Sequence, residues 1–224
     1  MSRGRLAVAA GVAVAALGAC SHRGGLLAPE PKALARAAPD SFDVRIESSR
    51  GPLVIRARRA WSPLGVDRFY YLVRHGYYDE ARFFRVVGGF VAQWGLSGDP
   101  LVNRAWNDKS IVDEPVRASN TRGKVAYARG GPNTRSVQLY VNLGDNVRLD
   151  TLSTFGFPPI GEVVSGMGAI DSLTHEYGGT RDARLPGPSQ DSIRIQGNGY
   201  LLRAFPKLDW IRRAAVDREW GRPR

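Results

Sequence analysis

The sequence contains very little cysteine and histidine, and these shortages exclude several classes of site. Cys20 is the only cysteine among 224 residues, so no disulfide can form within the chain and no multi-cysteine metal site can exist. The three histidines, His22, His75 and His175, lie far apart in the sequence, so we expect no metal site. The fold must therefore be held together by packing alone.

Long apolar runs and acidic residues are also scarce. The apolar run at residues 6–17 has twelve residues, whereas a transmembrane helix needs about 20. Lysine and arginine total 32 against 21 aspartates and glutamates, a net charge of +11, so anionic partners must be considered. The arginine clusters at residues 56–59 and 212–218 belong to no recognised nucleic-acid module. Residues 166–168 are only half of the glycine motif that binds dinucleotides. We therefore expect neither a nucleic-acid partner nor a cofactor.

The first 41 residues are typical of a targeting signal followed by a tether. Two arginines precede the apolar run, and Cys20 directly follows a glycine and an alanine, which matches the regions of an export signal. This arrangement resembles the bacterial lipoprotein signal, in which the cysteine is lipidated and becomes the first residue of the mature chain. We predict a signal peptide at 1–19, lipidation of Cys20 and a flexible tether at 20–41. An ordinary signal peptide with an incidental cysteine is the alternative.

From residue 42 onward the pattern favours short strands with a few helices. Alternating apolar residues on both sides of residues 49–51 predict an opening hairpin. Ser62 before Pro63, with Gly76 beyond, predicts a helix over 63–75. Composition also predicts a long surface loop at 96–124. Further strands are expected at 83–87, 90–94, 125–128, 138–142 and 160–164, and a short helix at 167–174.

The last part of the chain is expected to extend the domain. Ile193 and Ile195 alternate with polar residues and predict a last strand. Residues 198–224 predict one or two amphipathic helices broken at Pro206. Packing of these helices onto the barrel is the simpler expectation, and a helix that binds a membrane surface or a partner is the alternative.

Three motifs, in order, resemble the cyclophilin-type peptidyl-prolyl isomerases. Residues 83–93 are similar to the family's Phe-His-Arg-Val-Ile-x-Gly-Phe-x-x-Gln segment. Residues 128–140 are similar to Ala-x-x-Gly-Pro-x-Thr-x-x-x-Gln-Phe-Phe, and residues 160–167 to Phe-Gly-x-Val-x-x-Gly-Met. The resemblance implies a mainly β domain over 42–197, a closed eight-stranded antiparallel barrel capped by two helices, followed by the helical extension at 198–224.

The resemblance also implies catalysis of prolyl cis–trans isomerisation. Rotation about a peptide C–N bond has a barrier of about 18–20 kcal/mol, which an enzyme lowers through interactions that are stronger in the twisted state than in the planar ones. Arg85 matches the family's catalytic arginine, whose cation meets the twisted prolyl nitrogen. By the same resemblance, Gln93 orients Arg85 or contacts the substrate backbone.

A substrate site is implied beside these two residues. Its apolar and aromatic members would hold the proline ring, and the position usually occupied by asparagine, here arginine, would bind the substrate through its main chain. Ordinary core packing is the alternative for the aromatic members, and a turn-supporting hydrogen bond is the alternative for the glutamine. The implied substrate-binding residues are Phe90, Val91, Ala128, Arg129, Gln138, Tyr140 and Leu149.

Several positions depart from the family pattern. Phe84 stands where the family has histidine, and Trp94 where it has glycine. Residues 135–137 replace a small, Gly-Ser-like tripeptide, the segment 151–159 is longer than usual, and Phe157 is the nearest counterpart of a histidine that lines the pocket. These departures leave weak or altered activity open.

Together these observations predict an exported, membrane-anchored lipoprotein of the cell envelope that faces the periplasm or the exterior. We expect it to act as a monomeric isomerase on proline-containing polypeptides, without metal or cofactor. One alternative is a non-catalytic lipoprotein that binds proline peptides. Another is a structural envelope lipoprotein that uses the barrel only as a scaffold.

Overall fold

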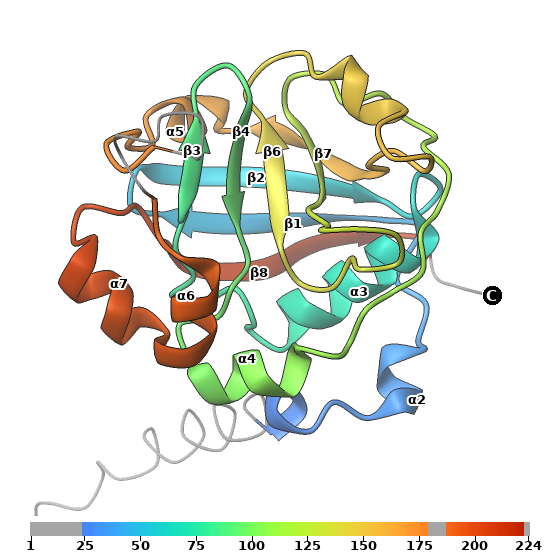
Figure 1. Ribbon diagram of the computed structural model, residues 1–224. Helices are drawn as coiled ribbons and strands as arrows, with labels where there is room; N and C mark the ends of the chain where they lie inside the picture. Colours follow the sequence, from blue (N-terminus) through green and yellow to red (C-terminus); the bar gives the residue numbers. More distant parts are fainter. Residues whose placement is uncertain (1–23, 179–186, 222–224) are drawn as a thin grey trace, which may run out of the picture.

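A curled antiparallel sheet is the centre of the fold in the computed structural model, which describes residues 24–178 and 187–221 (Figure 1). Within these residues the sheet has eight strands in the order β3-β4-β6-β5-β7-β2-β1-β8. The strands are β1 Ser41–Ser48, β2 Gly51–Arg58, β3 Arg85–Val87, β4 Val91–Trp94, β5 Lys124–Tyr127, β6 Leu139–Asn142, β7 Pro159–Ser165 and β8 Ile211–Trp220.

The two end strands of the sheet, β3 and β8, meet at a single point. An isolated bridge joins Arg82 to Trp210, where the Phe83 amide donates to the Asp209 carbonyl at 2.9 Å. Beyond this point β3 is only three residues long, while β8 has ten, so no continuous ladder connects them. The sheet is an open half-barrel, and the closed barrel expected from the sequence is not confirmed.

The helix α3, Pro63–Arg74, begins where the sequence predicts and ends one residue before the predicted end. Its buried face carries Phe69 and Leu72, which belong to the main core beneath the sheet. Ser62 does not cap the helix with its own side chain. Instead the Glu114 carboxylate accepts from the amides of Leu64 and Gly65, at 2.8 and 3.1 Å, and supplies the acceptors that the first turn needs.

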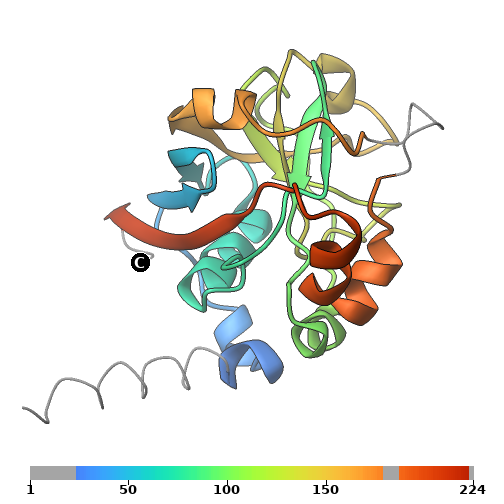
Figure 2. The same ribbon diagram turned by 90° about the vertical axis from the view of Figure 1, so that its left-hand side faces the viewer.

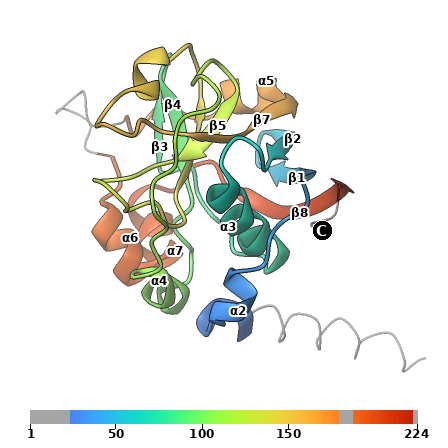
Figure 3. The same ribbon diagram turned by 90° about the vertical axis from the view of Figure 1, so that its right-hand side faces the viewer.

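The other described helices flank the sheet. In Figure 2, α6 and α7 lie together beside α4, and Figure 3 shows α2 below α3. The helix α4 lies inside the segment 96–124 that was expected to be a loop; the Asp99 side chain caps it by accepting from the Leu101 amide at 2.9 Å. The bounds are α2 Pro31–Leu34, α4 Pro100–Trp106, α5 Met167–Asp171, α6 Gln190–Gln196, α7 Asn198–Ala204 and the 3-10 helix η1 Val147–Asp150.

The C-terminal residues differ from the prediction in two places. The expected strand around Ile193 is the helix α6, and the expected helical extension at 198–224 is helical only in α7. Residues 211–220 form β8, which pairs with β1 in a register that sets Ala214 opposite Ile46. The apolar residues Ile211 and Ala214 fit a helical period, but the unpaired edge of β1 provides backbone partners that a local pattern cannot reveal.

The segment 24–41, expected to be a flexible tether, is packed onto the domain. Leu26 belongs to the main core, and its carbonyl accepts from the Trp106 indole at 2.9 Å. Ala38 is fully buried, and its amide donates to Asp67 at 2.8 Å. The predicted signal peptide 1–19 and Cys20 lie outside the described residues. No helix in the described ranges has the length and apolar character needed to cross a membrane.

Candidate active site

The hairpin of β3 and β4 brings Arg85 and Gln93 together. The Phe90 amide donates to the Val87 carbonyl across the connecting turn, and Gly89 takes a φ of 68° there, which glycine adopts without strain. The resulting register sets Arg85 directly opposite Gln93. Arg85 Nη1 donates to Gln93 Oε1 at 3.1 Å. The structure therefore places the two predicted catalytic residues in contact.

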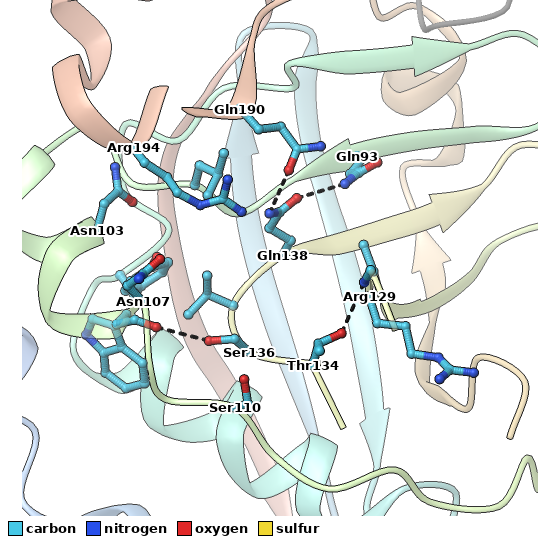
Figure 4. A pocket seen from close by; sticks show the side chains of 16 residues that line it. Gln93, Asn103, Asn107, Ser110, Arg129, Thr134, Ser136, Gln138, Gln190 and Arg194 are labelled. Atoms are coloured by element: carbon cyan, nitrogen blue, oxygen red, sulfur yellow. Dashed lines mark hydrogen bonds between the residues drawn. The ribbon is translucent and has the colours of Figure 1, made fainter. Parts of the chain in front are cut away.

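A row of amide side chains continues from this pair. Gln93, buried at 5% exposure, donates from Nε2 to Gln138 Oε1 at 2.8 Å. Gln138 in turn donates from Nε2 to Gln190 Oε1 at 3.0 Å (Figure 4). Gln190 is the first residue of α6, and sequence reasoning did not single it out, because no motif surrounds it.

A small apolar cluster lies next to the row. Its buried members are Val91, Ala126, Tyr140 and Leu149, and partly buried residues pack against them. The cluster contains all five of the apolar and aromatic residues that were predicted to bind substrate. It adds Ala126 and Phe157, of which Phe157 had been named only as a counterpart. The packed residues are Phe90, Ala128 and Phe157.

Two cations lie over the Phe90 ring, which packs against this cluster. The guanidinium carbon of Arg85 is 5.6 Å from the centre of the Phe90 ring, and that of Arg148 is 5.0 Å away. Arg85 is partly exposed, so the catalytic candidate lies at the edge of the cluster. A polypeptide bound against the cluster would therefore meet a fixed positive charge at its edge.

Buried asparagines hold the aromatic wall in place. Asn120 and Asn142 are fully buried, and the Tyr140 hydroxyl donates to Asn120 Oδ1 at 2.9 Å. Asn146 Nδ2 donates to the Phe90 carbonyl at 2.8 Å and to Asn142 Oδ1 at 2.8 Å. Sequence reasoning missed these residues, although an asparagine inside a strand, as Asn142 is in β6, is uncommon enough to be a signal.

Burial affects the ionisation of the tyrosine in this wall. Loss of contact with water, and then the nearby Asp150 carboxylate, raise the pKa of Tyr140, because both disfavour the charged phenolate. The hydroxyl therefore remains protonated and acts as a donor to Asn120.

Arg129 has a buried side chain and an accessible main chain. Its side chain is 2% exposed and pairs with Asp113, also 2% exposed, at 3.0 Å, while the residue as a whole is partly exposed. The guanidinium also donates to the carbonyls of Gly156 and Ser153, at 2.8 and 3.1 Å, and lies 5.0 Å from the Phe157 ring centre. The accessible part is thus the main chain, which suits binding of an extended peptide.

A cavity of about 430 Å³ adjoins the apolar cluster. Gln93, Ala128 and Gln138 line one side of it, so the cavity and the site share residues. The opposite side carries polar side chains from α4 and α6, including Asn103 and Arg194 (Figure 4). The site is therefore a cavity whose polar side is formed by α4 and α6, with the amide row and the apolar cluster on its other side.

Three of the departures from the family pattern, Phe84, Trp94 and Arg135, lie outside the apolar cluster, whereas Phe157 packs within it. Phe84 packs with Ile193 and Leu201 in a separate cluster beneath α6 and α7. Trp94 belongs to the main core. Arg135 is fully buried, and its side chain contacts Glu114 at 3.1 Å instead of entering the cleft.

In the part of the chain that the structure describes, no three His, Cys, Asp or Glu side chains are grouped so that they could hold a metal ion. The cavity offers arginines, amides and the hydroxyls of Ser110, Thr134 and Ser136. These groups can bind and polarise a peptide bond, and none of the described residues that line the cavity is a histidine, aspartate or glutamate that could activate a hydroxyl as a nucleophile.

Comparison with known proteins identifies similar chains. The family model described as "Cyclophilin type peptidyl-prolyl cis-trans isomerase/CLD" matches residues 42–197. Peptidyl-prolyl cis-trans isomerase B of Escherichia coli (strain K12) is 29% identical over 155 residues, which cover 67% of this chain and 94% of that protein. Peptidyl-prolyl cis-trans isomerase A of Dickeya dadantii (strain 3937) is 31% identical over 142 residues, 62% of this chain and 74% of that protein.

Solved structures show a related fold. The crystal structure of a Cryptosporidium parvum cyclophilin type peptidyl-prolyl cis-trans isomerase aligns with a TM-score of 0.54 at 18% identity, covering 80% of this chain and 99% of that one. A structure of the same protein in the presence of the dipeptide Ala-Pro aligns with a TM-score of 0.55 at 17% identity, covering 79% and 99%. At these identities the likeness concerns the fold alone.

Proposed function

Because the chain belongs to the cyclophilin-type peptidyl-prolyl cis-trans isomerase family, whose model matches residues 42–197, we propose that it catalyses cis–trans isomerisation of X-Pro bonds in polypeptides. One observation carries the proposal: the Arg85 guanidinium, held by Gln93 at 3.1 Å, lies over the Phe90 ring at the edge of the apolar cluster. This arrangement combines a place for a proline ring with a fixed cation at the edge of that place.

The reaction makes and breaks no covalent bond, so the site needs only to stabilise the twisted amide. Twisting removes the conjugation that gives the C–N bond its partial double-bond character, and the prolyl nitrogen gains a localised lone pair. A guanidinium can donate to this lone pair in the twisted state but finds no comparable acceptor in the planar ones. Arg85 therefore lowers the barrier by binding the transition state more tightly than either isomer.

The remaining cleft residues hold the substrate during rotation. Phe90, Tyr140 and Leu149 surround the proline ring, and the accessible main chain of Ala128 and Arg129 binds the polypeptide as an extended strand. With the ring held in the pocket, rotation is confined to the X-Pro bond beside Arg85. The adjoining cavity then receives a side chain of the substrate on one side of the proline.

We further propose that the protein is exported and anchored to the membrane of the cell envelope, facing the periplasm or the exterior, where it acts as a monomer on folding proteins. The order of charged, apolar and small residues before Cys20 supports export and lipidation. Two signals, or one acyl group with added contacts, are needed for stable anchoring. Loss of Arg3 and Arg5 with the signal peptide would lower the net charge from +11 to +9, which would still favour an anionic membrane surface.

A protease-coupled assay on a short X-Pro peptide tests the catalytic proposal. We expect turnover by the wild type and about a hundredfold loss in Arg85→Ala, because a preorganised donor to the developing charge is removed. Arg85→Lys should also lose most activity, since a point charge on a flexible stem cannot reproduce the directed donors. Arg45→Ala, an exposed arginine on β1, is the matched control and should behave as wild type.

The outcomes separate the three functional hypotheses. Wild-type turnover that Arg85→Ala retains would contradict the mechanism. Absence of turnover, with binding of a proline peptide observed by NMR, would favour a non-catalytic binding protein. Absence of both turnover and peptide binding would favour the third hypothesis, a structural envelope lipoprotein.

A further inference from the structure

The amide row that begins at Arg85 ends on a different part of the fold. Gln190 belongs to α6 and lies 52 residues beyond Gln138, its hydrogen-bond partner. Between them the chain passes through β6, η1, β7 and α5 before it returns to the site. The contact therefore depends on how α6 is placed, and not on the β3–β4 hairpin that carries Arg85 and Gln93.

The direction of every hydrogen bond in the row follows from its first member. An arginine guanidinium only donates, so Gln93 must turn its oxygen toward Arg85. Its amide nitrogen then points to Gln138, which must accept there through its own oxygen. The nitrogen of Gln138 consequently points to α6 and requires an acceptor, which Gln190 Oε1 supplies at 3.0 Å.

A change at the α6 end of the row can also reverse the hydrogen bonds that lead back to Arg85. Each primary amide has an acceptor at one end and a donor at the other, so reversing the last amide reverses those before it. If α6 offered a donor in place of an acceptor, Gln138 would turn its oxygen toward α6 and its nitrogen toward Gln93. Gln93 would then present its nitrogen to Arg85, and two donors would face each other.

The helix that carries Gln190 is held firmly against the site. Ile193 is fully buried in a cluster with Phe84, the residue directly before Arg85. The Ile193 carbonyl accepts from Asn103 Nδ2 of α4 at 3.3 Å, and Ser189 caps α6 by accepting from the Ser192 amide. The strand with the arginine and the helix with the last acceptor thus pack on the same apolar cluster, which keeps their separation constant.

From these contacts we infer that Gln190 is a positioning residue for Arg85: it terminates the row as an acceptor and thereby fixes the orientation in which Gln93 holds the guanidinium. The inference rests on the proposed function for its kinetic test. By this inference α6 does more than pack against the site. It controls how the Arg85 guanidinium is oriented toward the twisted prolyl bond in the transition state.

Substitutions at Gln190 can separate loss of the acceptor from other effects. The lysine of Gln190→Lys offers only donors, and the glutamate of Gln190→Glu offers only acceptors. The methionine of Gln190→Met is uncharged and offers neither. We expect kcat to fall about tenfold in Gln190→Lys and less in Gln190→Met, with KM little changed, because the arginine acts in the transition state. Gln190→Glu should restore most of the turnover. Gln196→Lys, the same change at an exposed position of α6, is the matched control.

A double-mutant cycle distinguishes positioning from general damage. If Gln190 acts only through Arg85, then adding Gln190→Lys to Arg85→Ala should cause no further loss of kcat. A further loss equal to that in the wild-type background would overturn the inference, as would wild-type kcat in Gln190→Lys. Equal losses in Gln190→Glu and Gln190→Lys would also overturn it, because retained acceptor character would then be irrelevant.

A spectroscopic measurement keeps the inference separate from the proposed function. The side-chain amide signals of Gln93 in NMR spectra should shift in Gln190→Lys and stay near their wild-type positions in Gln190→Glu and Gln196→Lys. An unshifted Gln93 signal in Gln190→Lys would overturn the inference even if the wild type is an active isomerase. An inactive wild type would overturn the proposed function, while the NMR comparison would still decide whether Gln190 orients the row.

Discussion

The buried ion pair of Arg129 and Asp113 offers a test of what holds the cleft in shape. Arg129→Met keeps an unbranched side chain of similar reach but removes the charge and the donors to Asp113, Ser153 and Gly156. Asp113 then remains as a carboxylate at 2% side-chain exposure, and burying an uncompensated charge is costly.

The size of the effect follows from the partners that Asp113 retains. Removing one member of a buried pair costs about 3–5 kcal/mol. Asp113 keeps the Asn133 amide as a donor at 2.8 Å, and Arg135 Nε lies 3.6 Å from its other oxygen without forming a hydrogen bond. This partial compensation places the expected loss of unfolding free energy at the lower end, about 3 kcal/mol.

Urea denaturation measures this loss as a change in midpoint at constant slope, and the melting temperature should fall by about 6–12 °C. The double variant Arg129→Met/Asp113→Asn should recover about 2 kcal/mol of the loss, since no unpaired charge remains and the asparagine still accepts from Asn133. Asp171→Ala is the control, because Asp171 pairs with Arg122 at 44% exposure of both side chains. An exposed pair of this kind contributes about 1 kcal/mol or less.

The same substitution should affect function through the loop that Arg129 holds. Loss of the hydrogen bonds from Arg129 to the carbonyls of Ser153 and Gly156 would loosen the segment that leads to Phe157. The KM for a proline peptide should therefore rise while kcat changes little. If Arg129→Met destabilises the protein no more than Asp171→Ala, the reasoning about the buried pair is refuted. If kcat falls while KM stays at its wild-type value, the loop does not act through substrate binding.

Two further predictions concern the pocket wall and the membrane anchor. Tyr140→Phe removes the donor to Asn120 Oδ1, but that oxygen keeps Asn142 Nδ2 at 3.2 Å, so urea denaturation should show a loss of only about 1 kcal/mol; a loss above about 3 kcal/mol would contradict this account of the network. Tyr140→Ala should weaken binding of a proline peptide more than binding of its alanine-substituted form, and equal weakening in a folded variant would place the proline site elsewhere. Cys20→Ser should move the protein out of the membrane fraction, because acylation adds about 0.8 kcal/mol of membrane affinity per buried CH₂. A wild-type mature chain that begins elsewhere and carries no acyl mass in mass spectrometry would refute lipidation.

The family motif was enough to predict that Arg85 and Gln93 lie together. Arg85 and Gln93 lie on adjacent arms of one short hairpin, and the Gly89 turn sets their register. The two residues are only eight positions apart, so a motif of fixed spacing is enough to specify their contact. The helix over 63–75 was predictable for the same reason, since proline at its start and Gly76 at its end are local signals.

Contacts between distant segments were decided by the tertiary structure. The helical period of Ile211 and Ala214 gave way to pairing with the open edge of β1, and the residues around Leu26, which look like a tether, found a place against Trp106. In each case the local preference is weak, while burial of apolar surface and satisfaction of backbone groups on a neighbouring element are strong.

The same distinction applies within the site. The predicted site residues were visible in the family motifs, but the partners that orient Gln138, Tyr140 and Arg129 carry no local signal; these partners are Gln190, Asn120 and Asp113. Each is an ordinary polar residue until the fold places it beside one particular donor or acceptor. A buried polar group must find a partner wherever the chain brings one, and that choice is made by packing across the whole domain.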